Sequence, residues 1–414
     1  MGYTVALREE VRRRIAEIGQ ADILVGIPSY NNAKTIGHVM RTAAEGMVKY
    51  FPDLKPVLVN SDGGSTDGTV EVARQAPVPK GVEKIITEYI GPSGKGSAFR
   101  TIFGIAQALG VRACVVVDSD LRSIEPWWIE RLAGPIIRGD YDYVAPYYTR
   151  HKYDGTITNN IAYPMTRSLY GVDVRQPIGG DFGLSAELAE SYLAKDVWDT
   201  DVARFGVDIW MTTTAINEGY RLCQAQLGVK IHDVKDPAVT LGPMFVQVVG
   251  TLFRLMGLYE DSWRRVRGSQ PMPFYGEPVE AEPEPVRVTL EAMIDKMRAG
   301  IGEFGSLWRA VLTPDNFSRV ERIAALDYGD YAFPAELWAR VVFDFAVAYN
   351  KSGLVPEEVI RAMTPLYYGR TAGLVIETRE MSNAQAEEVI KAQARIFEGL
   401  KPYLIERWAH SEET

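Results

Sequence analysis

The sequence has few of the residues that build cross-links. Among 414 residues there are only two cysteines, Cys114 and Cys223, and four histidines. Both cysteines lie inside apolar runs typical of strands and far apart in the chain, which favours core thiols in a reducing compartment over a disulfide framework. We therefore expect a cytoplasmic protein without structural disulfides.

An excess of positive charge is missing, and so is a long apolar run. The formal net charge of -9 excludes the basic surface that nucleic-acid binding requires. Residues 1–22 predict a charged amphipathic helix, because no apolar stretch follows their basic residues as it would in a signal peptide. The most apolar later stretch, 244–259, is interrupted by Gln247 and Arg254 and is too short to cross a bilayer. We expect no integral membrane segment.

What the sequence does contain is a regular alternation. Between residues 23 and 148, five apolar runs of strand length are separated by helical patterns. Strands that alternate with helices of crossover length indicate βαβ units and a mostly parallel sheet with helices on both faces. Ligands of such sheets bind at the carboxyl ends of the strands. Polar side chains follow three of the predicted strands at that position.

The length of the chain predicts more than one hydrophobic core. We expect one α/β domain over 23–275, with its ligand site at the carboxyl ends of the strands. Prolines alternate with glutamates in 276–287, which indicates an extended linker. Apolar and aromatic residues recur at helical spacing in 288–414, which predicts an α-helical C-terminal domain. Its aromatic residues suit a core or the interface of a homodimer, which we expect.

The D-S-D sequence 118–120 directly follows the apolar strand C-V-V-V. Two carboxylates, Asp118 and Asp120, are ligands that Mg²⁺ or Mn²⁺ accepts together with substrate phosphates. Such a short pattern alone is more often a solvated loop or a helix cap. Its position at the end of a buried strand favours a metal and diphosphate site.

Two glycine-containing loops open helices. The first, 62–69, places Asp62 and Gly63 where a base N–H could be bound, and a turn with a helix cap is the alternative. The second, 91–96, brings Lys95 and free N–H groups to a helix N-terminus, as a phosphate site would. It lacks the spacing of a Walker A motif, and a flexible turn is its alternative.

Single residues after strands and glycines complete the candidates. His232 ends an apolar strand and could join the carboxylates as a metal ligand, although an isolated histidine is more often structural. Asp181 and Asp208 each stand beside glycine, where a tight turn and a helix start are the alternatives. Nearby tryptophans, Trp198 and Trp210, could shape a sugar pocket.

Together and in this order, these motifs resemble the GT-A glycosyltransferases. The resemblance is greatest to the retaining branch that includes glucosyl-3-phosphoglycerate synthase and glucosylglycerate synthase, and it extends from about residue 23 to residue 252. It implies a GT-A fold, a Mg²⁺ or Mn²⁺ cofactor, a nucleotide diphosphate sugar as donor and a hexosyltransferase activity. The nucleotide is UDP, GDP or ADP, and the sugar is glucose or mannose.

The resemblance also implies a role for individual positions. The expected nucleotide-sugar site consists of Pro28, Tyr30, Asn32, Asp62, Gly63, Lys95, Asp118 and Ser119. The expected metal ligands are Asp120 and His232, and the expected catalytic residues are Asp208 and Asp181. The expected acceptor-binding residues are Thr158, Asn159, Asn160 and Lys230, with His151 as a further positive group near the acceptor.

Two departures from the family bear on the acceptor. The phosphoglycerate enzymes hold the acceptor phosphate with an arginine in a glycine-rich loop, where this chain has Thr158–Asn160. Where they have another arginine, this chain has Lys230, which lacks the bidentate fork. Both changes favour a less charged acceptor such as D-glycerate, as in glucosylglycerate synthesis for compatible solutes.

Other functions remain open from the sequence. A GT-A enzyme acting on 3-phosphoglycerate or on a polyprenyl phosphate is the first alternative. A non-catalytic nucleotide-sugar-binding module and a nucleotidyltransferase are further ones. Arg370 could reach an active site, although nothing in the sequence places it there.

Overall fold

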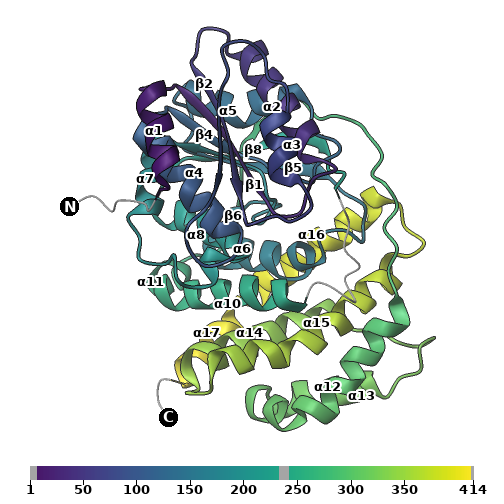
Figure 1. Ribbon diagram of the computed structural model, residues 1–414. Coiled ribbons are helices and arrows are strands. Elements are labelled where there is room, and N and C mark those ends of the chain that lie inside the picture. The colour runs from purple at the N-terminus through teal and green to yellow at the C-terminus, as the bar shows by residue number, and fades with distance from the viewer. Residues whose placement is uncertain (1–6, 233–241, 412–414) are drawn as a thin grey trace. The chain divides into compact units, whose positions relative to one another are not determined.

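The structure is a computed structural model that describes residues 7–232 and 242–411 (Figure 1). Its contacts divide the chain into two compact units, which we call the sheet unit and the helical unit. The sheet unit contains the described parts of Met1–Thr149, Ile178–Asp233 and Met272–Pro283. The helical unit contains the described parts of Arg150–Pro177, Val234–Pro271 and Glu284–Thr414.

The sheet unit is built on one eight-stranded sheet in the order β10-β8-β5-β7-β4-β1-β2-β3. Its strands are β1 (Ile23–Ser29), β2 (Pro56–Asp62), β3 (Glu83–Glu88), β4 (Ala113–Val116), β5 (Tyr143–Thr149), β7 (Phe182–Ser185), β8 (Leu222–Val229) and β10 (Phe274–Tyr275). Only β7 runs antiparallel to its neighbours, β4 and β5. The other neighbours are parallel, which confirms the predicted mostly parallel α/β sheet.

Helices cover both faces of this sheet. They are α1 (Glu9–Ile18), α2 (Ile36–Tyr50), α3 (Thr69–Gln75), α4 (Lys95–Leu109), α5 (Pro126–Ile137), α7 (Ala186–Leu193), η2 (Asp201–Ala203) and α8 (Val207–Asn217). Every residue of β1 is buried, because alternate side chains face opposite layers. Ile23, Val25 and Ile27 share a core with α2 and α5. Gly26 faces α4, where a Cβ atom would lie 2.3 Å from Ile102.

The parallel strands bring their carboxyl ends to one edge of the sheet. Ser29, at the end of β1, is in register with Asp62, at the end of β2. On the other side of β1, Gly26 is in register with Val116, at the end of β4. The loops after these three strands, which carry most of the expected nucleotide-sugar residues, therefore start side by side.

The helical unit contains ten helices among its described residues. They are η1 (Thr158–Ala162), α6 (Tyr163–Tyr170), α10 (Gly242–Leu258), α11 (Glu260–Trp263), α12 (Leu290–Val311), α13 (Pro314–Ala324), α14 (Ala335–Lys351), α15 (Pro356–Thr378), α16 (Asn383–Gly399) and α17 (Lys401–His410). Capping residues mark the start of two of these helices: Ser382 and Gln385 form a capping box before α16, and Thr313 caps α13. The predicted helical C-terminal region is confirmed.

The two units interleave along the chain. Residues 150–177 and 242–271, which the sequence suggested were part of the catalytic domain, are grouped with the C-terminal helices. The short strands β6 (Val172–Asp173) and β9 (Gln270–Pro271) pair with each other inside the helical unit. Residues 276–289 form no helix or strand, as expected of a linker. The functional domain boundaries stay a prediction.

Both cysteines are buried and free. Cys114 lies in β4 and Cys223 in β8, and burial raises the pKa of the Cys223 thiol to about 12. This confirms their place in the core. Of the helices in the described ranges, none is both long and apolar enough to cross a membrane.

Candidate functional site

The loops after β1 and β2 are joined by hydrogen bonds. Asn31 has a φ of 54°, the one non-glycine residue of 7–232 and 242–411 with positive φ. Its N–H donates to Ser65 Oγ (2.8 Å), and its Oδ1 accepts from the N–H of Thr66 (3.0 Å). This unusual conformation leaves the preceding Tyr30 side chain 62% exposed. The ring lies beside Gly63, where a Cβ atom would be only 3.3 Å from it.

Asp62 organises the second loop. One carboxylate oxygen accepts from Ser29 Oγ (2.6 Å) and Ser65 Oγ (2.7 Å), and the other accepts from the N–H groups of Gly64 (2.9 Å) and Ser65 (2.7 Å). The side chain is buried, so its four bonds shape the loop from within. A direct bond to a nucleobase would have to replace one of them.

Asn32 connects the first loop to the D-S-D segment. Its Oδ1 accepts from the Tyr30 N–H (3.0 Å) and from Ser119 Oγ (2.8 Å). Pro28 is buried within β1, in register with Ser61. The expected nucleotide-sugar residues of these loops are therefore gathered at one edge of the sheet.

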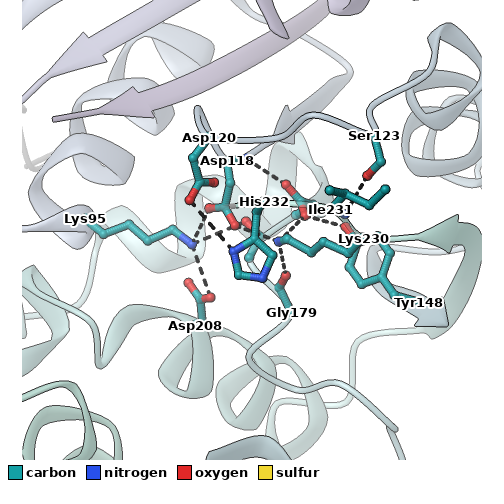
Figure 2. Close-up of polar contacts among 12 residues, drawn as sticks. Lys95, Asp118, Asp120, Ser123, Tyr148, Gly179, Asp208, Lys230, Ile231 and His232 are labelled. Atoms are coloured by element: carbon teal, nitrogen blue, oxygen red, sulfur yellow. Dashed lines mark hydrogen bonds and ion pairs between the residues drawn. The ribbon is translucent and has the colours of Figure 1, made fainter. Parts of the chain in front are cut away.

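Asp118 is held by two lysines. Lys95 Nζ lies 2.9 Å from one carboxylate oxygen, and Lys230 Nζ lies 2.7 Å from the other (Figure 2). Burial opposes the charged carboxylate, but Lys230 and Lys95 outweigh it and lower the pKa of Asp118. Burial also opposes the charged Lys95, and the carboxylates of Asp118 and Asp208 raise its pKa.

The three N–H groups of the Lys230 ammonium all donate hydrogen bonds within the protein. Its ammonium group donates to Asp118 (2.7 Å), to Asp181 (2.8 Å) and to the carbonyl of Gly179 (2.9 Å), which accounts for its three N–H donors. The side chain is only 3% exposed. Asp181 is fully buried and also accepts from the Asp118 N–H (2.7 Å) and from Tyr148 Oη. Both residues thus make internal contacts, and their expected roles in catalysis and acceptor binding stay predictions.

Lys95 is bound more loosely and lies nearer to an unsatisfied acceptor. It is 3.3 Å from Asp208 Oδ2 and 3.4 Å from the carbonyl of Gly180. The other oxygen of Asp208 is buried and has no hydrogen-bond partner among the described residues. Burial raises the pKa of Asp208, against the effect of Lys95. A buried carboxylate oxygen without a donor is costly, and such atoms are common where a ligand binds.

Gly94 and Gly96, in the loop expected to bind phosphate, are needed for close backbone packing. A Cβ atom on Gly96 would lie 1.7 Å from the carbonyl of Val202, and one on Gly94 would lie 2.5 Å from the carbonyl of Ala203. Gly96 also donates its N–H to the carbonyl of Arg204 (3.2 Å). These glycines permit the close backbone approach that brings Lys95 beside the turn leading into Asp208.

Asp120 and His232 face each other across the site. His232 Nδ1 lies 3.9 Å from Asp120 Oδ2, and both side chains are partly exposed (Figure 2). Burial and the neighbouring Asp118 raise the pKa of Asp120, so a cation beside it would be stabilising. No three His, Cys, Asp or Glu side chains of the described ranges are placed to enclose a metal ion. The pair suits a divalent ion that takes its other ligands from phosphates and water.

The other expected acceptor residues lie in the helical unit. Asn159 accepts from Arg175 (2.9 Å), and Asn160 donates to Thr371 (3.3 Å). Thr158, Asn159 and Asn160 are all buried there. Arg370 is also buried, and it donates to Gln393 Oε1 (2.7 Å). Each of these residues is thus part of the packing of its own unit.

Sequence reasoning missed several residues of the site. Tyr148 donates to Asp181, and Ser123 accepts from the Ile231 N–H. Tyr148 stands near the end of β5, so its position after an apolar run was an available signal. Ser123 follows the D-S-D segment without any pattern of its own. Trp198 and Trp210 pack edge to face with centroids 5.3 Å apart and are buried.

Comparison with known families agrees with this geometry. Residues 24–181 match the model of glycosyl transferase family 2. Over this segment the chain is similar to glycosyl transferase family 2. The segment contains β1 to β5, the D-S-D segment and Asp181. The expected resemblance to the GT-A glycosyltransferases is confirmed, as is the fold class.

Two curated relatives of this chain are both glucosyl-3-phosphoglycerate synthases. Glucosyl-3-phosphoglycerate synthase of Mycolicibacterium paratuberculosis is 27% identical over 277 residues, which cover 62% of this chain and 77% of the relative. The synthase of Petrotoga mobilis is 24% identical over 266 residues, which cover 59% and 77%.

A similar solved structure is the Mycobacterium tuberculosis glucosyl-3-phosphoglycerate synthase in complex with Mn²⁺, UDP and phosphoglyceric acid. It is 24% identical, with a TM-score of 0.45, and the match covers 59% of this chain and 81% of that one. A second complex of that enzyme, with Mg²⁺ and UDP, has the same TM-score and covers 60% and 84%.

Proposed function

We propose that this protein is a metal-dependent, retaining glycosyltransferase that moves glucose from a nucleotide diphosphate sugar to a small hydroxy acid. One observation carries the proposal. At the carboxyl ends of the strands of a sheet whose first part is similar to glycosyl transferase family 2, Asp120 and His232 face each other, and Lys95 lies between Asp118 and Asp208. Cation, diphosphate and acceptor groups can meet there.

The donor would bind over the loops after β1, β2 and β4. The exposed Tyr30 ring beside Gly63 offers an apolar platform for a nucleobase. Lys95, bound loosely to two carboxylates, is placed to exchange one of them for the diphosphate. Asp120 and His232 would hold Mg²⁺ or Mn²⁺, which supplies neutralisation of the leaving diphosphate.

Asp208 would act on the acceptor side of the reaction. Its buried Oδ1 lacks a partner within the described chain and can accept a hydrogen bond from a sugar or acceptor hydroxyl. Retention then follows from attack on the face that the diphosphate leaves, a route that needs no pair of carboxylates for double displacement. Asp208 binds and orients the hydroxyl in this scheme.

The charge of the sheet-unit site favours an acceptor with little negative charge. Four carboxylates and two ammonium groups meet there, and the donor diphosphate would add further negative charge beside a single divalent cation. Lys230 is engaged by Asp118 and Asp181, so it adds no bond to an acceptor without giving one up. D-glycerate is therefore our first candidate acceptor. The names of the curated relatives support 3-phosphoglycerate as the second.

The experiment is a matrix of donors and acceptors. Purified protein is incubated with UDP-, GDP- or ADP-glucose or the mannose donors, with Mg²⁺ or Mn²⁺, and with D-glycerate or 3-phosphoglycerate. We expect a product of glucose and D-glycerate by mass spectrometry, with the anomeric configuration retained by NMR. Faster transfer to 3-phosphoglycerate would replace the acceptor in our proposal, and no transfer or donor hydrolysis in any combination would overturn it. A cytoplasmic location and a homodimer stay predictions.

A further inference from the structure

The segment after β8 is attached to the loop after β4 at two places. Lys230 Nζ bonds to Asp118 and to Asp181 at one of them. At the other, the Ile231 N–H donates to Ser123 Oγ (2.8 Å), and the Ile231 carbonyl accepts from the Arg122 N–H (2.8 Å). Asp120 and His232 project from these same two segments (Figure 2).

The first attachment is tightly built. Lys230 is almost completely buried, and its three bonds are between 2.7 and 2.9 Å long. Gly180, with a φ of 94°, lets the chain pass this close, because a Cβ atom there would lie 2.2 Å from Asp118 Oδ2. Tyr148 donates to the same oxygen of Asp181, Oδ2, that Lys230 contacts. The end of β8 therefore cannot shift without breaking buried ion pairs.

The second attachment is local and uses one side chain. Ser123 Oγ accepts a hydrogen bond from the backbone N–H of Ile231, the residue between Lys230 and His232. Loss of the hydroxyl would leave that N–H without this acceptor, while the backbone bond of Arg122 remains. The position of His232 would then be less well defined.

The separation of the metal pair makes this position important. Ligands of Mg²⁺ lie 2.0–2.1 Å from the ion in near-octahedral geometry, so two adjacent ligand atoms are about 3 Å apart. Nδ1 of His232 and Oδ2 of Asp120 are 3.9 Å apart, between about 3 Å for adjacent ligands and about 4.1 Å for opposite ones, so the pair can share an ion only if its separation is held to within about 1 Å. With only two protein ligands available, a larger displacement would lose the ion.

We propose that Ser123 and Lys230 are positioning residues that hold the end of β8 against the loop after β4 and thereby set the separation of Asp120 and His232. This inference rests on the proposed function, because it assumes that the pair holds the cation of the donor complex. In this assignment neither residue needs to contact the donor. Lys230 is thus assigned to the architecture of the site, in place of acceptor binding.

The test measures Mn²⁺ binding directly, by EPR titration of the full-length protein with saturating UDP. Ser123→Ala should weaken Mn²⁺ binding about tenfold, and Ser123→Thr, which keeps the hydroxyl, should restore most of it. Lys230→Met should weaken it by more, about 100-fold. Ser191→Ala removes a comparable bond of a surface serine to Glu218 and should leave Mn²⁺ binding unchanged. Thermal unfolding of each variant separates weak binding from misfolding.

The outcomes are distinguishable. If the wild-type protein binds Mn²⁺ with UDP and Ser123→Ala binds it equally well at an unchanged Tm, the positioning role is wrong while the proposed function stands. If Ser123→Thr is as weak as Ser123→Ala, the hydroxyl is not the cause and the inference also fails. A wild-type protein that binds no Mn²⁺ in the presence of UDP would overturn the proposed function and this inference with it.

Discussion

Both units of this protein bury charged groups, but they treat them differently. In the helical unit, one oxygen of Asp344 accepts from Tyr403 (2.6 Å) and Arg407 (3.1 Å), and the other accepts from Asn316 (2.7 Å) and the Thr313 N–H (3.3 Å). In the sheet unit, one oxygen of the buried Asp208 has no partner within the described chain. A buried carboxylate whose oxygens all accept hydrogen bonds stabilises the fold. A buried carboxylate oxygen without a donor can instead accept a hydrogen bond from a ligand.

The same contrast separates the arginine and lysine networks. Arg175 makes two parallel bonds to Glu387, of 2.7 and 2.8 Å, in the helical unit. Lys95 of the sheet unit reaches its second carboxylate only at 3.3 Å. Short, bidentate contacts favour rigidity, while a longer contact of a lysine can be exchanged. The following predictions test this difference between the units.

The largest effect is expected at the metal pair. Asp120→Ala removes one of two protein ligands, so metal-dependent turnover should fall about a thousandfold, equivalent to several kcal/mol of transition-state stabilisation. Initial rates at varied Mn²⁺ concentration measure it. Asp140→Ala, at an exposed aspartate of the same unit, is the control. Near-normal turnover of Asp120→Ala would refute the assignment of this ligand.

Asp344→Ala should act on stability alone. It leaves the groups of Asn316, Tyr403 and Arg407 without their shared acceptor, and we expect the free energy of unfolding to fall by about 3 kcal/mol. Urea unfolding measures this loss, and UDP affinity at a temperature where the variant is folded should be unchanged. A loss below about 0.5 kcal/mol would show that this network does not stabilise the fold.

Asp208→Asn should have the opposite signature. Removal of a buried, partly unsatisfied charge should leave Tm unchanged or higher, while kcat should fall about 100-fold because the acceptor hydroxyl loses its partner. Thermal unfolding and steady-state kinetics on one preparation measure both. Asp344→Asn is the matched control and should lose stability. A substantial loss of Tm in Asp208→Asn would remove the contrast between the two units.

The smallest effect concerns the exception in the helical unit. Lys401 is buried and donates only to the carbonyls of Leu169 (3.2 Å) and Val266 (3.0 Å), and burial lowers its pKa to about 8. The unfolded chain therefore binds more protons than the fold from about pH 8 to about pH 10.4, and stability should rise with pH across that window.

Lys401→Met should abolish this contribution. The difference in stability between wild type and variant, from urea unfolding at pH 7.5 and pH 9.5, measures it with other titrating groups cancelled. Lys391→Met, at a more exposed lysine paired with Glu388, is the control. If the unfolding free energies of wild type and Lys401→Met changed equally with pH, burial would not lower the pKa of Lys401 and this prediction would be wrong.

The sequence predicted the parts of the fold that have a local signal. The five apolar runs became β1 to β5, and the polar groups after β1, β2 and β4 meet at one edge. Asp120 and His232 also lie near each other, as expected, and their role as metal ligands stays a prediction. These successes share a cause: strand periodicity and the rule that parallel strands end together are both readable from a single sequence.

The sequence did not reveal how residues distant in the chain share their bonds. Lys230 was read as an acceptor group, but its bonding partners come from residues 118, 179 and 181. Residues 150–177 were assigned to the catalytic domain, yet Arg175 bonds to Glu387 more than 200 positions later. Such contacts leave no periodic pattern, because they depend on tertiary packing alone.

The close packing of Gly94 and Gly96 on residues 202–204 gives the site a mechanical property. Since no side chain separates these backbones, the start of α4 at Lys95 lies directly against the turn that precedes α8, the helix that carries Asp208. A displacement of this turn would therefore be expected to displace both Lys95 and Asp208. Amino-acid changes in residues 202–204 should therefore alter donor binding at Lys95 and acceptor orientation at Asp208 together.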